Sequence, residues 1–217
     1  MTGMGIRDDQ FAGLRLFLPR AWKVETEDLL GPFTMVVSKP EPDPNDPEQL
    51  ARAAAEEARL WRIAVDVDAD YSDDPLDDLG EGSEHVSVAT GTLQNLAEAP
   101  VEVPDVDPPY DSEPSDEELF EVAEDLATTY GALLDFYPER SVRSEQVTRR
   151  VLDLDGRIAA SYSHTYSAGV NGEETGHLHL VVVHLAEGRL SFALGVAKPD
   201  RDRTLIDDII DSVRPLP

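Results

Sequence analysis

Cysteine is absent from the 217 residues of this sequence. A disulfide framework and a thiolate metal site are therefore excluded. Long apolar runs are absent too, since none approaches the roughly 18 consecutive apolar residues of a membrane-spanning helix. The first residues, MTGMGIRDDQ, lack the charged-then-apolar organisation of a secretory signal. We therefore expect a cytoplasmic protein that does not associate with membranes.

Basic residues are scarce, because 18 Lys and Arg stand against 45 Asp and Glu, for a formal net charge of −27. The imbalance is local. Residues 41–125 hold 27 acidic residues and three arginines, a net of −24, which leaves −3 for the rest of the chain. Adaptation to high salt would spread acidic residues over every exposed surface. Here nearly all of the excess acid lies within residues 41–125, so it is a property of that region. That region repels nucleic acid and permits a basic protein partner.

Strands are predicted wherever apolar and polar residues alternate with a period of two. The first comprises Leu14, Leu16 and Leu18 and ends at Pro19. Further strands are predicted at residues 33–38, 63–67, 86–93, 147–154, 157–167, 177–185 and 189–196. Asp155-Gly156 and the glycine-containing stretch 186–188 are typical of tight turns, so the last strands should form antiparallel hairpins.

Three helices are predicted, each with its own start signal or apolar stripe. The first covers residues 46–62. The second begins at a capping box made by Ser115 and Glu118, and its apolar residues recur at spacings of three and four as far as Tyr137. The last covers residues 202–213. Aromatic residues of these segments are expected to fill the core, namely Trp22, Trp61, Tyr130 and Tyr137.

The order of these elements predicts a fold class. Strands joined by tight turns, with helices separated from them in sequence, favour an α+β layer architecture: an antiparallel sheet flanked by helices. We expect a single domain over residues 1–217, with an acidic Pro/Asp-rich insert. Residues 1–10 should be disordered, and 66–83 and 100–114 should be acidic loops.

Three histidines in GHLHLVVVHL raise the question of a metal site. On a strand, His177 and His179 share one face and His184 lies on the other. His164 would join His179 if the tyrosines of the preceding strand faced the same core as the valines of this one. A zinc site needs three or four ligands, and its histidine ligands need carboxylate or backbone groups that hydrogen-bond to them. No Asp or Glu adjacent to these histidines in the sequence provides such a group. We therefore interpret the histidines as residues on a solvent-facing or half-buried sheet surface, with no cofactor. His164, His177 and His179 remain the candidate metal ligands.

Other catalytic or binding motifs are weak. The run that begins at Asp66 resembles a calcium loop, but Tyr71 stands where glycine is needed and Asp77 where a bidentate glutamate is needed. No GxSxG elbow is present, and Ser161, Ser163 and Ser167 lie on one alternating strand face. No catalytic residue is predicted. The predicted binding segment consists of the acidic residues Asp66, Asp68, Asp70, Asp73, Asp74, Asp77, Asp78 and Glu81.

The C-terminal half resembles a known family. The stretches LDLDGRIAASYSHTY, HLHLVVVHLAEGRLSFALGVAKPD and LIDDIIDSVRPL, together with FLPRAW near the N-terminus, are similar to the PsbP-like superfamily. This superfamily includes PsbP, the Ran-binding Mog family and actinobacterial LpqN. The resemblance covers about residues 11–38 and 140–217, and the sequence departs from LpqN in lacking a lipid-accepting cysteine. It implies an antiparallel sheet between helices and a non-catalytic binding or assembly role.

Three functions follow as hypotheses. The first is a non-enzymatic protein-binding, adaptor or chaperone-like domain that uses its sheet face and its acidic segment. The second is an acidic inhibitor or immunity protein that mimics phosphate to bind a basic partner. The third is a metal-dependent hydrolase built on the three candidate histidines. The expected partner is a protein, and the oligomeric state is left open.

Overall fold

The computed structural model describes residues 3–27, 29, 32–39, 85–93, 114–133, 136–138, 141–172, 174–185 and 189–217. The chain divides into two compact units, residues 1–39 with 84–217, and residues 40–83. The second unit lies wholly outside the described residues. The helix at 46–62, the strand at 63–67, both acidic loops and the single-domain assignment therefore stay predictions.

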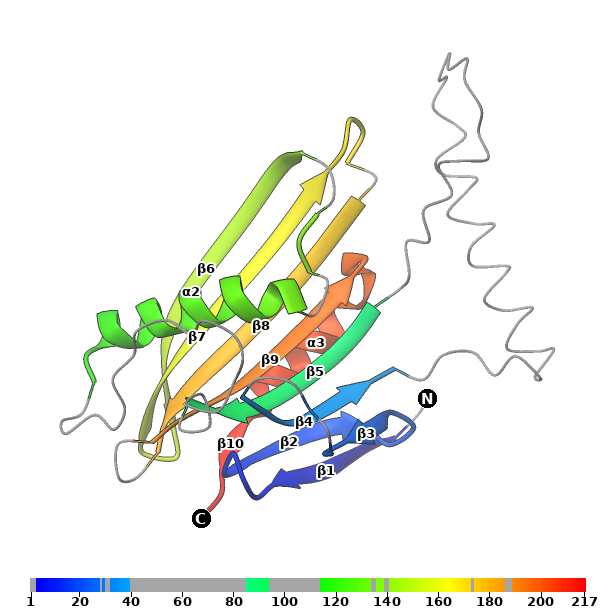
Figure 1. Ribbon diagram of the computed structural model, residues 1–217. Coiled ribbons are helices and arrows are strands. Elements are labelled where there is room, and N and C mark those ends of the chain that lie inside the picture. The colour runs from blue at the N-terminus through cyan, green and yellow to red at the C-terminus, as the bar shows by residue number, and fades with distance from the viewer. Residues whose placement is uncertain are drawn as a thin grey trace. The chain divides into compact units, whose positions relative to one another are not determined.

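A seven-stranded antiparallel sheet forms the centre of the first unit (Figure 1), in the order β3-β4-β5-β9-β8-β7-β6. Its strands are β3 (Lys23–Glu25), β4 (Phe33–Ser38), β5 (His85–Thr92), β6 (Val142–Leu154), β7 (Arg157–Ala168), β8 (Glu174–His184) and β9 (Leu190–Lys198). The turn between β6 and β7 uses Asp155 and Gly156 at φ values of 55° and 79°, as expected for a tight hairpin. The predicted antiparallel sheet is confirmed.

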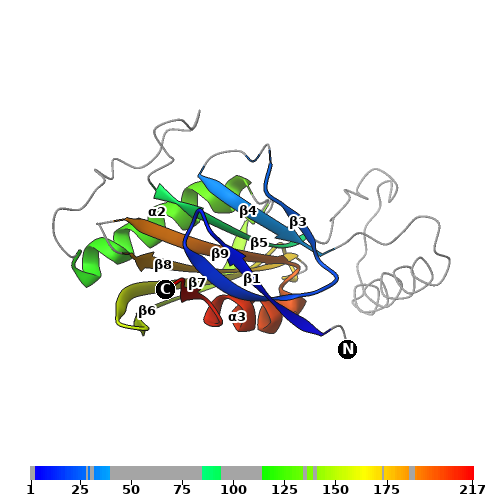
Figure 2. The same cartoon turned by 90° about the horizontal axis from the view of Figure 1, so that it is seen from below.

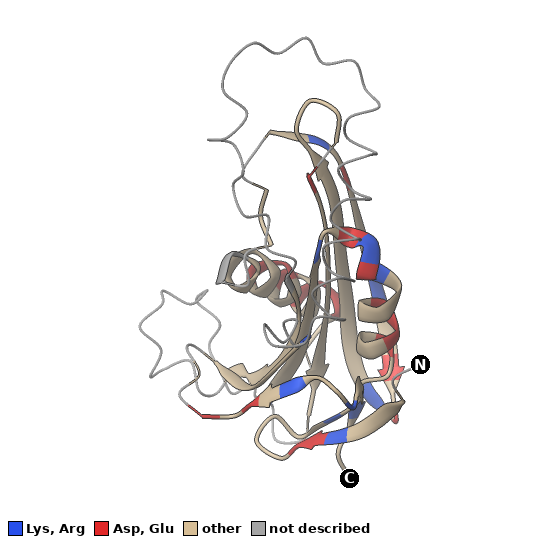
Figure 3. Ribbon diagram, turned by 90° about the vertical axis from the view of Figure 1, so that its right-hand side faces the viewer, with Lys and Arg blue, Asp and Glu red and all other residues tan. Residues whose placement is uncertain are grey.

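Helices cover both faces of this sheet (Figures 2 and 3). Helix α2 (Asp116–Leu133) contacts β7 and β8 on one face, and α3 (Arg203–Asp211), preceded by the short 3-10 helix η3 (Asp200–Asp202), contacts β8 and β9 on the other. The strands at the centre are apolar on both sides. In β8, Leu178 and Leu180 pack in the core under α2, whereas Val181 and Val183 pack in the core under α3. The α+β class is confirmed.

The start of α2 follows the predicted capping box. The Ser115 amide donates to Glu118 Oε2 at 2.7 Å, and the Glu118 amide donates to Ser115 Oγ at 3.3 Å. The helix ends at Leu133, earlier than predicted, and the Phe136 amide folds back to donate to the Gly131 carbonyl at 2.9 Å. Tyr137 is consequently 37% exposed and does not fill the core as expected. None of the described helices is long and apolar enough to cross a membrane.

A second, three-stranded sheet has the order β1-β2-β10, with β1 at Met4–Asp9, β2 at Leu14–Pro19 and β10 at Arg214–Pro215. The prediction that residues 1–10 are disordered is wrong, because β1 occupies most of them. Asp9 supplies the physical reason. Its buried carboxylate accepts hydrogen bonds from the amides of Phe11 and Ala12 at 3.0 and 3.1 Å and from the hydroxyls of Thr34 and Thr90, each at 2.5 Å. This carboxylate therefore connects the hairpin formed by β1 and β2 to strands β4 and β5.

Candidate functional site

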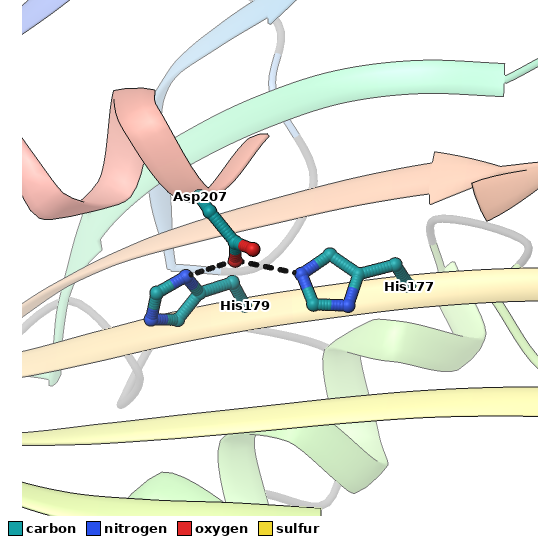
Figure 4. A group of neighbouring side chains, drawn as sticks. All are labelled: His177, His179 and Asp207. Carbon is teal, nitrogen blue, oxygen red and sulfur yellow. Dashed lines mark hydrogen bonds and ion pairs between the residues drawn. The ribbon is translucent and has the colours of Figure 1, made fainter. Parts of the chain in front are cut away.

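Two histidines of β8 meet an aspartate of α3 beneath that helix (Figure 4). Asp207 Oδ1 lies 2.8 Å from His177 Nε2 and 2.8 Å from His179 Nδ1. The strand period places both rings on the α3 face, and the helix places Asp207 above them. One carboxylate oxygen therefore accepts two hydrogen bonds from two rings.

The other nitrogen of each ring contacts a hydroxyl of β7. Thr165 Oγ1 lies 2.8 Å from His177 Nδ1, and Ser161 Oγ lies 2.9 Å from His179 Nε2. Because an ionised carboxylate only accepts, each ring donates toward Asp207 and accepts from its hydroxyl. All four ring nitrogens are then satisfied with both imidazoles neutral.

Burial and hydrogen bonding set the charges of this cluster. His177 and His179 are 0% and 1% exposed, and burial lowers the pKa of His177, against a smaller opposing effect of Asp207. Burial alone would raise the pKa of Asp207, but the hydrogen bonds from His179 and His177 outweigh it and lower that pKa to about 2. Arg203 Nε lies 3.6 Å from Asp207 Oδ2, on the side where the carboxylate is 32% exposed. The cluster thus carries one negative charge next to one arginine.

Close packing of α3 on β9 holds the cluster in place. Gly195 is paired with His179 across the sheet, and a Cβ at this position would lie 2.7 Å from Ile206 Cγ2. Glycine therefore allows the helix to approach the sheet. Ile206, Ile209 and Ile210 fill the core on either side of the contact.

The three side chains form a donor set that zinc uses, so their geometry decides whether they fit an ion. Their ligand atoms lie within 4.8 Å of one another. Ligands of a tetrahedral zinc, each about 2.0–2.1 Å from the ion, lie about 3.4 Å apart. Here Asp207 Oδ1 itself occupies the point between the two ring nitrogens, at hydrogen-bond distance from both. The geometry is that of a closed hydrogen-bond cluster, and the rings and the carboxylate would have to move apart to admit an ion.

Ser161, His179 and Asp207 are connected in the order of a serine-hydrolase triad. A nucleophilic hydroxyl must reach a substrate, however, and Ser161 is only 2% exposed. The arrangement therefore has the hydrogen bonds of a triad without an accessible nucleophile. Its clearest effect is to attach α3 to β7 and β8 through a polar contact inside an otherwise apolar layer.

The predicted histidine group is only partly assembled. His177 and His179 do meet, but His164 does not join them: it pairs with Leu178 across the sheet and lies on the α2 side, with Nε2 3.3 Å from Glu145 Oε2. The reason is that the tyrosines of β7 face the α2 core whereas Val181 and Val183 face the α3 core. The expectation that the histidines sit on a solvent-facing or half-buried surface is also wrong for His177 and His179.

The sequence pattern around the histidines does not identify Asp207, because this residue is not adjacent to them. It lies 28 and 30 residues away along the chain. The available signal was the amphipathic pattern of the last helix, in which Asp207 follows Ile206 at the edge of the buried stripe. The acidic segment from Asp66 to Glu81 lies outside the described residues.

A second feature of interest is the outer edge of the large sheet. Strand β6 has 13 residues, and residues 142–151 are all exposed. Among the described residues, β6 pairs with β7 alone, so its other edge is left without a strand. Three valines on it are large and exposed, at 47%, 44% and 46% respectively: Val142, Val147 and Val151.

The charge of this edge differs from that of the chain. Residues 142–151 contain three arginines and one glutamate, a net of +2, whereas the whole chain carries −27. Arg149 is held by an ion pair with Glu124 of α2, and Arg150 Nη2 lies 3.6 Å from Asp211 Oδ1 of α3. Acidic residues recur along α2 (Figure 3), and Glu124 among them pairs with Arg149. The edge therefore presents apolar side chains and charges of both signs.

These observations define an α+β protein with helices on both faces of an antiparallel sheet, a closed polar cluster and an open sheet edge. No protein-family profile matches the sequence, and no curated protein matches it either. Solved structures do. Cyanobacterial PsbP (CyanoP) from Synechocystis is 13% identical, with 99% of this chain and 94% of that chain covered and a TM-score of 0.48.

Two further solved structures are similar. LpqN, involved in cell envelope biogenesis of Mycobacterium tuberculosis, is 12% identical, with 99% and 91% of the chains covered and a TM-score of 0.42. The Ran-binding protein Mog1p of Saccharomyces cerevisiae is 9% identical, with 100% and 97% covered and a TM-score of 0.44. PsbP, LpqN and Mog proteins are also the groups that the sequence stretches described above resemble.

Proposed function

We propose that this protein is a non-enzymatic protein-binding module, and that it binds through the open edge strand β6. The observation that carries the proposal is a 13-residue edge strand whose residues 142–151 are exposed throughout. A long exposed edge offers unpaired backbone N–H and C=O groups to another strand. Partners that bind in this way add an extended segment to the sheet, and the side chains beside it provide selectivity.

The remainder of the described sheet supports the edge as the binding surface. Its central strands are covered by α2 on one face and by α3 with the small sheet on the other. The sheet face that the first sequence hypothesis assigns to partner binding is thus covered by helices and strands of the same chain. The opposite edge, β3, has only three residues, which limits strand addition there.

A non-catalytic role agrees with the polar cluster. Ser161, His177 and His179 are buried, and their hydrogen bonds are closed among themselves, Asp207 and Thr165. A catalytic group has to contact a substrate within hydrogen-bond reach. The cluster is better suited to fixing the position of α3.

Affinity capture tests the proposal. The tagged wild-type chain and a Val147→Lys/Val151→Lys variant would be used to capture proteins from a lysate of the source organism, with a mass-spectrometric readout. Both valines are exposed, so the substitutions leave the core intact, while lysine on an edge strand opposes strand addition. We expect the captured partner to be lost. An untagged copy of this chain counts as a partner in this readout.

The matched control is Val170→Lys, because Val170 is 80% exposed and lies outside β6. This variant should retain the partner. Hydrogen exchange of the bound complex locates the contact, and the amides of residues 142–151 should exchange more slowly than in the free protein. Retention of every partner by the double variant, or unchanged exchange in β6, would refute the proposal.

A further inference from the structure

We infer that the partner of β6 is β6 of a second copy, paired antiparallel about a two-fold axis at Val147; this inference rests on the proposed binding function of that edge. The two seven-stranded sheets would then form one continuous sheet. In such an isologous interface each surface must complement itself. The sequence of β6 meets that requirement over its longest matched stretch when the axis lies at Val147.

The faces of β6 follow from its pairing with β7. Glu145, Val147 and Arg149 are opposite Tyr166, His164 and Tyr162, so all three side chains lie on the α2 face. A two-fold axis perpendicular to the sheet keeps the α2 faces of both copies on the same side. Residues at equal distances before and after the axis then lie directly opposite each other.

With the axis at Val147, opposite charges meet twice. Glu145 lies opposite the partner's Arg149, Arg149 lies opposite the partner's Glu145, and Val147 lies opposite the partner's Val147. Directly opposite side chains are close enough in an antiparallel pair to form ion pairs and apolar contacts. On the other face, the uncharged Ser144 and Gln146 lie opposite the partner's Arg150 and the partner's Thr148. No like charges are directly opposed over residues 144–150.

Neighbouring registers lose this match. An axis at residue 145 places Glu145 against the partner's Glu145. An axis at residue 149 places Arg149 against the partner's Arg149 and Glu145 against the partner's Asp153. Like charges placed directly opposite each other are destabilising. Axes at residues 146 and 148 leave Glu145 opposite a valine, so neither of the two Glu145–Arg149 ion pairs of the dimer forms. Among axes at residues 145 to 149, only the axis at Val147 combines two ion pairs with an apolar centre. An axis at Val151 also places Arg149 opposite the partner's Asp153, but it pairs only residues 148–154 of β6, whereas the axis at Val147 pairs residues 142–152.

Contacts within each copy prepare the same side chains. Arg149 is already oriented by Glu124 of α2, and Glu145 Oε2 lies 3.3 Å from His164 Nε2. The dimer would extend these into a row of alternating charges across the interface. The exposed Val147 is 44% accessible in the single chain and would be covered. The interface thus buries apolar surface and matches charge in one step.

Sedimentation equilibrium of the purified full chain at physiological ionic strength tests the inference. Wild type should be a dimer. Glu145→Arg and Arg149→Glu should each weaken the dimer at least about tenfold, because each turns both ion pairs into repulsions. The double variant Glu145→Arg/Arg149→Glu restores both pairs with reversed direction and should dimerise again. Arg157→Glu, the same charge change outside the paired segment, should have no effect.

A mixture of the two single variants gives the sharpest readout. In the mixed dimer, two arginines of one variant face two glutamates of the other. The mixture should therefore form a heterodimer more tightly than either variant forms a homodimer. Circular dichroism and thermal melts confirm that all variants fold. A misfolded variant cannot give this rescue.

Three results would overturn the inference: a wild-type monomer at all concentrations measured, single variants that dimerise like the wild type, or a mixture that stays monomeric. A monomeric wild type that still captures a different protein through β6 would remove the second copy as partner but leave the proposed function in place. Loss of both dimerisation and β6-dependent capture would remove both.

Discussion

The removal of Asp207 tests the interpretation of the polar cluster as a structural attachment of α3. Asp207→Ala takes the acceptor away from His177 Nε2 and His179 Nδ1, which both lie 2.8 Å from it. A buried donor left without a partner costs about 1–3 kcal/mol, so two of them cost about 2–6 kcal/mol. The carboxylate is 32% exposed, and water entering the vacated space would satisfy part of this loss. We therefore expect the free energy of unfolding to fall by about 2–4 kcal/mol.

Urea unfolding monitored by circular dichroism measures this change. Asp207→Asn keeps a carbonyl oxygen able to accept both N–H groups and should cost less than alanine, about 1 kcal/mol. Asp208→Ala is the matched control, because Asp208 is the next residue of α3 and is exposed. It should change stability by less than about 0.5 kcal/mol. If Asp207→Ala were as stable as Asp208→Ala, the cluster would not hold α3, and its assignment as a structural contact would be refuted.

Five further outcomes are expected. The pKa of Asp207, about 2, lies below its ordinary value of 3.8, so the stabilisation by the ionised carboxylate is present above pH 4 and lost as the pH falls toward 2. Between pH 4 and pH 2 the free energy of unfolding should therefore drop by about 1–2 kcal/mol, and Asp207→Asn should make this drop smaller. The lowered pKa of His177 adds a loss of stability as the pH falls below 6.5, since the unfolded chain then binds the proton more readily. Gly195→Ala should destabilise by about 1–3 kcal/mol by forcing Ile206 away, whereas an unchanged melting temperature would show that α3 shifts freely. Elemental analysis of purified protein should find no stoichiometric zinc, and one equivalent per chain would restore the metal-dependent alternative. Replacement of the acids at 66–81 by Ser and Asn should leave β6-dependent capture intact, and loss of a salt-sensitive basic partner would instead support the phosphate-mimic hypothesis.

Local signals in the sequence were sufficient for most elements of the described unit. The turn dipeptide Asp155-Gly156 and the capping box at Ser115 act within a few residues, and the structure contains both. Strand β1 was missed because it depends on Asp9, whose hydroxyl partners Thr34 and Thr90 are distant in sequence. Local sequence patterns therefore do not predict an element that is held in place by a polar side chain with distant tertiary contacts.

The histidine cluster was missed for a related reason. In LHLVVVHL both faces of the strand carry residues that a core accepts, so alternation alone does not say which face receives which helix. Placing the tyrosines of β7 on the same face as Val181 and Val183 gives the wrong result, because these residues belong to different cores. The resulting error moved His164 to the wrong side. Knowledge of where α3 packs would have been needed to place Asp207 over His177 and His179.

The two edges of the large sheet differ in a way that bears on function. Exposed edges promote unwanted association, and proteins commonly shorten them or place charges on them. Edge strand β3 follows this rule, with three residues of which Lys23 and Glu25 are charged and paired at 2.5 Å. Edge strand β6 carries charges, but it is not shortened: it has 13 residues and exposed valines. Charges that merely prevented pairing would work with any arrangement of signs. In β6 they are arranged so that Glu145 and Arg149 flank Val147 symmetrically, which favours the register centred on Val147 over its neighbours. This selectivity is the property expected of an edge that binds a defined strand.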